Sequence, residues 1–135
     1  MGYELPVLVV EDSFLIAASL EETLLEAGRT VVVARSVAEA ETAMAEQSFA
    51  AALLDYMLPD GESLPLARRL HDGGCKVAVI SGVDRAVLPE DDAIAAQFPK
   101  PMDEREVIAW VDQVMQVVTP AQASAGAGAG TVAPA

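Results

Sequence analysis

The sequence predicts an α/β domain with a five-stranded parallel sheet and helices on both of its faces. Short apolar runs alternate along the chain with segments of helical periodicity. The runs are continuously apolar, as is typical of strands covered on both faces. Four of them end on different polar residues, which are Glu11-Asp12, Asp55, Ser81 and Lys100. Because open α/β sheets bind ligands at the carboxyl ends of their strands, a shared site is expected at that edge.

The first two predicted strands enclose a helix. Leu5–Val10 is a continuous apolar run and Thr30–Ala34 is short and β-branched, which favours strands at both places. Asp12 or Ser13 is the expected N-cap of the intervening helix, and Gly28 marks its end. The apolar stripe of this helix consists of Ile16, Ala17, Leu20, Leu24 and Ala27.

The next helix opens with a capping box. Ser36 and Glu39 have the spacing of that motif, and the helix is expected to run to about Gln47. Ala50–Leu54 is the third predicted strand. The chain then continues into Pro59-Asp60-Gly61, a combination typical of turns. Asp60 is therefore interpreted as a turn residue rather than as a metal ligand.

The third helix opens at Ser63 and Pro65 and stops at Gly73-Gly74. Lys76–Ile80 follows as the fourth strand. The segment Gly82–Ile94 contains a proline and has poor apolar spacing, so it predicts at most a short helix or an irregular connection.

The last elements are a short strand and a strongly periodic helix. Ala95–Phe98 is the expected fifth strand, and Asp103 caps the final helix. The apolar face of this helix consists of Val107, Ile108, Val111, Val114, Met115 and Val118. Residues 1–118 are thus expected to form one domain, and the Ala/Gly-rich residues 119–135 a disordered tail.

Composition restricts the class of partner. The net charge of −13 repels nucleic-acid phosphates, so no nucleic-acid partner is expected. No apolar run approaches the roughly 18 residues that span a membrane, and no secretory signal is visible, so no membrane association is expected. The single cysteine, Cys75, cannot form an internal disulfide, which favours a cytoplasmic location. Cys75 itself is expected to be a small buried hydrophobe.

The strand ends carry the motifs of a known family. These motifs are Val-Val-Glu11-Asp12-Ser, Leu-Leu-Asp55-Tyr-Met-Leu-Pro-Asp-Gly61, Ser81-Gly82 and Lys100-Pro101. With them, the chain from about Leu5 to Val118 resembles the receiver domain of bacterial two-component response regulators. It is similar to stand-alone receivers, including the alphaproteobacterial type with an atypical fourth helix. The resemblance implies a flavodoxin-like, doubly wound sheet with strand order 2-1-3-4-5.

The resemblance also implies a phosphorylation site. Asp55 would accept a phosphoryl group from a histidine kinase or phosphotransfer protein, with Mg²⁺ as cofactor. The implied metal ligands are Asp12 and Asp55 directly, Glu11 through water, and the carbonyl oxygen of Met57. Carboxylates about 5 Å apart repel one another by roughly 3 kcal/mol per pair at an effective dielectric of about 20, and a divalent cation relieves this repulsion.

Lys100 and Ser81 complete the implied catalytic set with Asp55. Lys100 would supply a compact positive charge to the phosphoryl oxygens. The hydroxyl of Ser81 and the amides of Tyr56 and Gly82 would donate hydrogen bonds to them. The chain would then catalyse at most its own phosphorylation and dephosphorylation.

Two features depart from the receiver pattern, namely Gln97 and the segment between Ser81 and Lys100, which is short and interrupted by Pro89. Gln97 stands where receivers carry a switching aromatic residue, and Phe98 is expected to point to the other face of its strand. We therefore expect Gly82–Ile94 to switch by an order–disorder change. The apolar side chains of Met57 and Val83 are expected to flank the phosphoryl group on Asp55. Because neither can orient an attacking water molecule by a hydrogen bond, we expect slow self-dephosphorylation.

The expected downstream protein partner binds at the face of the fourth helix, fifth strand and fifth helix, including Gln97, Met102 and Arg105. With 135 residues, the chain is expected to have no room for a DNA-binding or enzymatic output domain. One alternative is a pseudo-receiver that binds partners without phosphorylation. Another is a haloacid dehalogenase-type phosphatase, but that family needs an Asp where Met57 stands.

Overall fold

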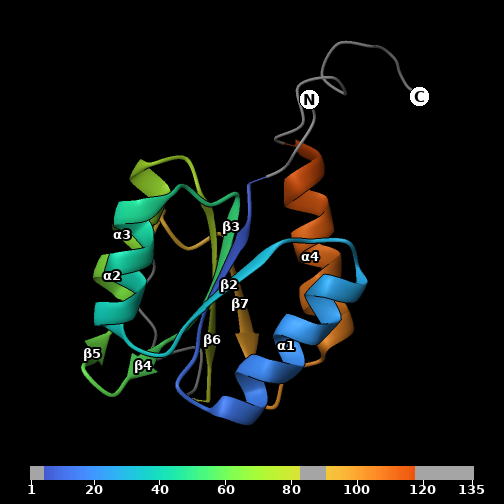
Figure 1. The fold of residues 1–135 in the computed structure, drawn as a ribbon, viewed down its shortest axis with the longest axis horizontal. Coiled ribbons are helices and arrows are strands. Elements are labelled where there is room, and N and C mark those ends of the chain that lie inside the picture. Colours follow the sequence, from blue (N-terminus) through green and yellow to red (C-terminus); the bar gives the residue numbers. More distant parts are fainter. Residues whose placement is uncertain (1–4, 83–90, 118–135) are drawn as a thin grey trace.

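The computed structural model describes residues 5–82 and 91–117. Five parallel strands form one sheet in the order β2-β1-β3-β6-β7 (Figure 1). The strands are β1 (Val7–Val10), β2 (Val31–Ala34), β3 (Ala51–Asp55), β6 (Lys76–Ser81) and β7 (Ala96–Pro99). Since β6 and β7 are the fourth and fifth strands of this sheet, the predicted order 2-1-3-4-5 and the flavodoxin-like class are confirmed. The switch predicted for Gly82–Ile94 falls mainly on residues 83–90, which lie outside the described residues together with the predicted role of Val83 and the predicted tail.

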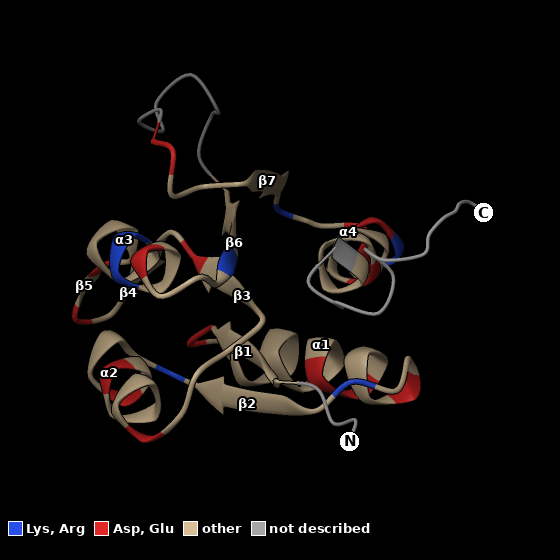
Figure 2. Cartoon of the chain, turned by 90° about the horizontal axis from the view of Figure 1, so that it is seen from above, with Lys and Arg blue, Asp and Glu red and all other residues tan. Residues whose placement is uncertain are grey.

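Helices cover both faces of the sheet, as predicted. The pair α1 (Phe14–Glu26) and α4 (Glu104–Val117) lies on one face, and the pair α2 (Val37–Glu46) and α3 (Leu64–Asp72) lies on the other (Figure 2). Across residues 5–82 and 91–117, no helix combines the length and apolar character that crossing a membrane requires.

The strands contribute to two hydrophobic cores because their side chains alternate between the faces. On β1, Leu8 and Val10 pack beneath α2 and α3, whereas Val7 and Val9 pack beneath α1 and α4. All four side chains are fully buried. A strand buried on both faces must be apolar at every position, which explains the continuous apolar runs in the sequence.

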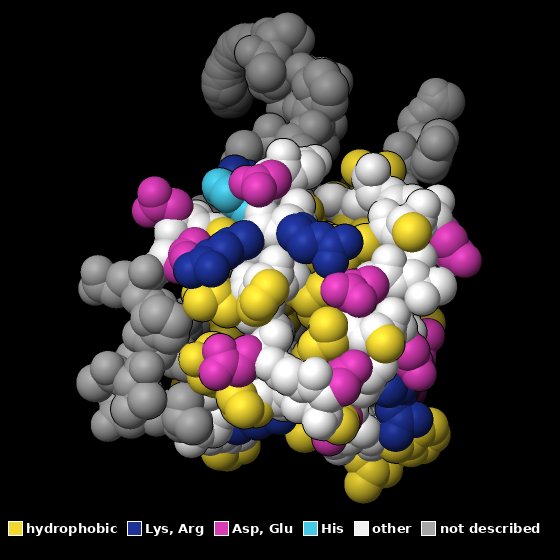
Figure 3. All heavy atoms as spheres, turned by 90° about the vertical axis from the view of Figure 1, so that its left-hand side faces the viewer, with side chains coloured by type: hydrophobic (Ala, Val, Ile, Leu, Met, Phe, Trp, Pro, Cys, Tyr) yellow, Lys and Arg dark blue, Asp and Glu magenta, His cyan; other side chains and the backbone are white. Residues whose placement is uncertain are grey.

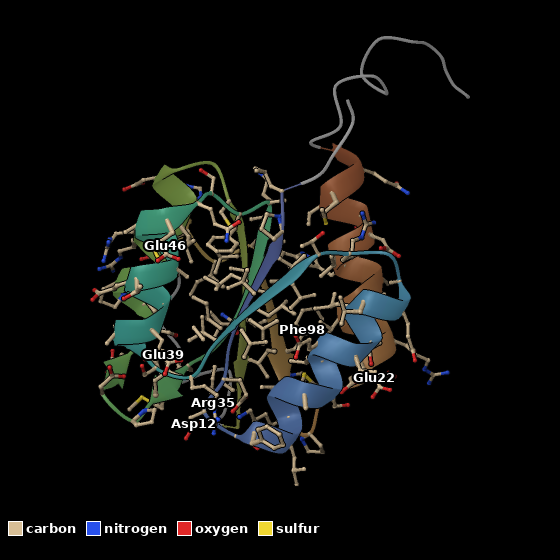
Figure 4. The ribbon with its side chains drawn as sticks, in the orientation of Figure 1. Asp12, Glu22, Arg35, Glu39, Glu46 and Phe98 are labelled. Carbon is tan, nitrogen blue, oxygen red and sulfur yellow. The ribbon has the colours of Figure 1, made fainter. Side chains whose placement is uncertain are left out.

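Phe98 and Trp110 join β7 to α4. Their rings meet edge to face, with 6.4 Å between centroids and an interplanar angle of 74°. Phe98 belongs to the core beneath α1 and α4, between the sheet and these helices (Figure 4). Because side chains alternate along β7, Gln97 lies toward the opposite face, as the sequence predicts.

The helix ends follow the predicted caps with some differences. Ser13 is the N-cap of α1, and its Oγ accepts from the backbone N–H of Ile16 at 3.4 Å. Gly28, at φ +87°, follows the end of that helix. Ala27 was expected in the apolar stripe but is exposed, because the helix ends before it.

In the capping box of α2, the Ser36 Oγ accepts from the Glu39 N–H at 3.1 Å. The Glu39 carboxylate accepts from the N–H of Arg35, one residue earlier than the motif predicts. At the start of α4, an oxygen of the predicted cap, Asp103 Oδ1, accepts from the Arg105 N–H at 2.9 Å. The side chains of Ser13, Ser36 and Asp103 each accept from an amide group that has no partner within its helix.

A short hairpin between β3 and α3 was not predicted. It consists of β4 (Met57–Leu58) and β5 (Gly61–Glu62), which pair antiparallel around the predicted turn. Two residues per strand are too few to produce a periodic pattern in the sequence. Ser63, predicted to open α3, is fully buried and makes no side-chain cap there, because its Oγ donates to the Tyr56 carbonyl at 3.2 Å.

The surface over α2 and α3 carries interspersed charges of both signs (Figure 3). An ion pair crosses from one helix to the other, with 3.0 Å between Arg69 Nη1 and Glu41 Oε2. A second pair places Arg68 Nη2 of α3 2.9 Å from Asp91 Oδ2. Both residues of the first pair and Arg68 of the second are exposed, so each pair contributes little to stability.

Candidate phosphoacceptor and metal site

The polar residues predicted at the strand ends lie at one edge of the sheet. β1 ends directly before Glu11-Asp12, and β3 ends at Asp55. β6 ends at Ser81, and Lys100 follows β7. Figure 4 shows this edge at the bottom of the view, where Asp12 is labelled. The parallel order of the strands therefore places chemistry from four separate segments together, as the sequence predicts.

Three carboxylates meet at this edge. Glu11, Asp12 and Asp55 each offer an oxygen, and these oxygens all lie within 4.8 Å of one another. Glu11 is 2% exposed and Asp55 is 8% exposed, whereas Asp12 faces solvent. Such a cluster is electrostatically costly unless a cation compensates it, and burial of two members increases that cost.

Lys100 provides a cation from the protein itself. Its Nζ lies 3.2 Å from Asp55 Oδ2 and 3.2 Å from Glu11 Oε1. One ammonium thus bridges the two buried carboxylates, while the exposed Asp12 is left to solvent. The side chain of Lys100 is 26% exposed, so the bridge is partly screened by water.

The surroundings shift the pKa values of this pair. Burial raises the pKa of the Asp55 carboxyl from 3.8 to about 6, the charge of Glu11 adds to this, and the hydrogen bond from Lys100 opposes it. Burial alone would lower the pKa of Lys100, but its contacts with Glu11 and Asp55 outweigh burial and raise it. Lys100 therefore stays charged at neutral pH.

The carboxylate of Glu11 is positioned by its own loop. Its Oε2 accepts from the Ser13 N–H at 3.0 Å. Its Oε1 is buried beside Lys100 Nζ but accepts no well-aligned hydrogen bond. A buried carboxylate oxygen with spare capacity, next to two further carboxylates, fits a hard divalent cation such as Mg²⁺, which prefers oxygen ligands.

The remaining predicted groups lie at the end of β6 and on the segments that continue from β3 and β6. Ser81 is buried, and its carbonyl accepts from the Lys100 N–H at 3.0 Å. Gly82 is exposed, and the side chain of Met57 is 53% exposed. The amide of Tyr56, expected to serve the phosphoryl group, instead donates to the Ile80 carbonyl at 3.0 Å.

Sequence reasoning missed two contacts near this edge. An Arg35 guanidinium N–H donates to the Asp12 carbonyl at 3.1 Å (the two residues lie side by side in Figure 4). The Asp60 carboxylate accepts from the first two amides of α2, and these hydrogen bonds hold its pKa below the usual range. Asp60 is not a member of the carboxylate cluster. No local motif marks either contact, because each joins residues about two dozen positions apart.

Comparison with known proteins places these features in context. No protein-family model matches the chain. The transcriptional regulatory protein AruR of Pseudomonas aeruginosa is 34% identical over 133 residues, which cover 89% of this chain. The chain spans only 53% of the length of that protein, so it is similar to about half of it.

Several solved structures share the fold of this chain. A CheY-like response regulator receiver domain from Methanospirillum hungatei JF-1 has a TM-score of 0.79 at 22% identity, over 89% of this chain and 100% of that one. The HemR receiver domain from Leptospira biflexa has a TM-score of 0.74 at 24% identity, over 87% of this chain and 98% of that one. A sensor protein from Polaromonas sp. JS666 has a TM-score of 0.71 at 26% identity, over 83% of this chain and 97% of that one. This chain therefore has the fold of CheY-like response regulator receiver domains, and it is similar in sequence to about half of a transcriptional regulatory protein.

Proposed function

We propose that this chain is a phosphoacceptor receiver in two-component signalling, phosphorylated on Asp55 by a histidine kinase or phosphotransfer protein. The observation that carries the proposal is the position of the Asp55 carboxylate. It lies at the end of the central strand, shares its site with two other carboxylates and contacts Lys100 at 3.2 Å. A carboxylate oxygen in this place can attack phosphorus while neighbouring charges compensate the transferred group.

In the proposed transfer, an oxygen of Asp55 attacks the phosphorus of the donor phosphohistidine. The P–N bond breaks, and its electron pair returns to the imidazole of the donor. Lys100 supplies positive charge beside the phosphoryl oxygens. The hydroxyl of Ser81 and the amide of Gly82 donate hydrogen bonds to them. The transfer therefore rests on positioning and charge compensation rather than on a separate general base.

Glu11, Asp12 and Asp55, with the carbonyl of Met57, are the residues that would hold Mg²⁺. When bound, Mg²⁺ neutralises the carboxylates and the charge of the incoming phosphoryl group. Without a cation, the ionised Asp55 would stand among like charges, and its approach to a phosphoryl anion would be disfavoured. We therefore expect phosphorylation to require a divalent cation.

The downstream partner is proposed to bind beside β7 and α4. The side chain of Arg105, at the start of α4, is 93% exposed there. Met102, expected on the same face, lines a groove of about 290 Å³ with Ile16 of α1 and Glu104 of α4. The cytoplasm stays the expected compartment, since the chain has one cysteine, which is a free thiol.

Intact mass after incubation with acetyl phosphate tests the phosphoacceptor role. We expect a gain of one phosphoryl group that needs Mg²⁺ and is absent in Asp55→Asn. The exposed Asp92 provides the matched control, and Asp92→Asn should be phosphorylated like the unchanged chain. Loss of the modification in Asp92→Asn, or its persistence in Asp55→Asn, would contradict the assignment of Asp55. No modification from acetyl phosphate or from a phosphohistidine donor would favour the pseudo-receiver alternative.

A further inference from the structure

The turn of the hairpin after Asp55 is tied to a helix from another part of the chain. Asp60 lies between β4 and β5. Its Oδ1 accepts from the Val37 N–H at 2.8 Å and its Oδ2 from the Ala38 N–H at 3.1 Å. These are the first two amides of α2, which have no partner within the helix. Ser36 caps the third amide of α2, so the helix and the hairpin share the capping of one terminus.

The hairpin is also held at its base and along its side. The carbonyl of Tyr56 accepts from both the N–H and the hydroxyl of Ser63, at 3.0 and 3.2 Å. Leu58 is 6% exposed and packs in the core beneath α2 and α3. Gly61 has φ +147°, and a Cβ there would lie 4.0 Å from a methyl group of Val37. The segment that follows Asp55 is therefore fixed against α2 at its turn.

The residue two positions before α2 reaches the other acidic loop. An Arg35 guanidinium N–H donates to the Asp12 carbonyl at 3.1 Å, and the guanidinium lies 5.7 Å from the ring centroid of Phe14. The backbone N–H of Arg35 is held by the Glu39 carboxylate at 2.8 Å. Residues 35–38 consequently contact both the loop that carries Asp12 and the hairpin that follows Asp55.

We propose that Arg35 and Asp60 are positioning residues that set the separation of the Asp12 and Asp55 carboxylates, and thereby the affinity of the site for a divalent cation. Neither is a member of the carboxylate cluster, whose oxygens lie within 4.8 Å of one another. Like charges push the two loops apart, and a shared attachment at the start of α2 opposes that movement. This inference rests on the proposed function, because it concerns the same cation site.

The test compares two variants that both remove a cap of α2. Asp60→Ala frees the hairpin as well, whereas Ser36→Ala removes the cap and leaves the hairpin attached. Mg²⁺ binding is measured by isothermal titration calorimetry, and circular dichroism confirms that each variant is folded. Outer residues that orient metal ligands change affinity by about 10-fold or more, so Asp60→Ala should weaken Mg²⁺ binding by about that factor. Ser36→Ala should bind Mg²⁺ like the unchanged chain.

Three further variants keep the test decisive if Asp60→Ala does not fold. Asp60→Asn retains one acceptor oxygen and should show a smaller loss of Mg²⁺ affinity. Arg35→Ala should weaken Mg²⁺ binding, and Arg35→Lys should restore part of it. Equal Mg²⁺ affinities for the Asp60 variants, the Ser36 variant and the unchanged chain would overturn the positioning role. A lack of Mg²⁺ binding by the unchanged chain would overturn the proposed cation site itself, and the positioning role with it.

Discussion

Lys100 Nζ donates a hydrogen bond of 3.2 Å to Asp55 Oδ2 across 45 positions of sequence. The same ammonium lies 3.2 Å from Glu11 Oε1, so one cation serves two buried carboxylates. This arrangement has two consequences. The native state depends on Lys100 for charge compensation, and an external cation bound at this site would compete with Lys100 for the same oxygens.

Replacement of Lys100 by Ala should separate these two effects. It leaves Glu11 and Asp55 buried without their cation, and we expect a loss of about 2 kcal/mol in the free energy of unfolding without metal. The affinity for Mg²⁺ should rise, because the competing charge is gone. Urea unfolding and calorimetric Mg²⁺ titration measure the two effects. Lys76→Ala, at an exposed position, is the control, and an equal loss of stability in both variants would contradict the role of Lys100.

Asp55→Asn should stabilise the protein at neutral pH in the absence of metal. Burial, followed by the charge of Glu11, raises the pKa of Asp55 from 3.8 to about 6. The native state therefore binds the proton more tightly than the unfolded chain between these values. The stability that this proton contributes is fully present below about pH 4 and is lost as the pH rises through about 6.

Relative to the unchanged chain, Asp55→Asn should thus gain on the order of 2 kcal/mol at pH 7.5, and the gain should disappear below about pH 4. Denaturant unfolding in a chelator across this pH range measures the difference. A stability difference that does not change with pH would show that ionisation of Asp55 is not its cause.

Phe98→Ala should both destabilise the fold and change the environment of Trp110. The two rings contact edge to face beneath α1 and α4, and removal of one leaves a cavity that costs about 2 kcal/mol. Trp110 is the only tryptophan, so its fluorescence reports this contact directly, and its emission should shift to longer wavelength. Phe14→Ala is the control, because Phe14 is 65% exposed and should change stability little.

Cys75 should be unreactive in the folded protein. Its side chain is buried, and burial raises the pKa of the thiol to about 12, so little thiolate forms at neutral pH. Because Cys75 is the only cysteine, labelling by a disulfide reagent should follow unfolding and report the opening of the region between α3 and β6. Fast labelling under native conditions, at a rate independent of denaturant, would contradict this expectation.

Much of the fold could be predicted because its signals are local. A strand buried on both faces needs apolar residues at every position, so β1 and β3 stood out as continuous runs. The helices showed periodic stripes and capping residues such as Ser13 and Ser36. The hairpin of β4 and β5 was missed because two-residue strands have no period, and Ala27 was misplaced because the end of α1 precedes it.

The residue types at the candidate site could be predicted from the sequence, because each stands at or just after the end of a predicted strand and parallel strands end at one edge of the sheet. Their arrangement was decided only by the tertiary structure. The contact of Lys100 with Asp55 crosses 45 positions, and the capping of α2 by Asp60 crosses 23. Such contacts depend on how far each loop extends beyond its strand and on which backbone groups remain without partners once the helices have packed. Residue identity predicts the chemistry of this edge, whereas packing sets the distances at which that chemistry operates.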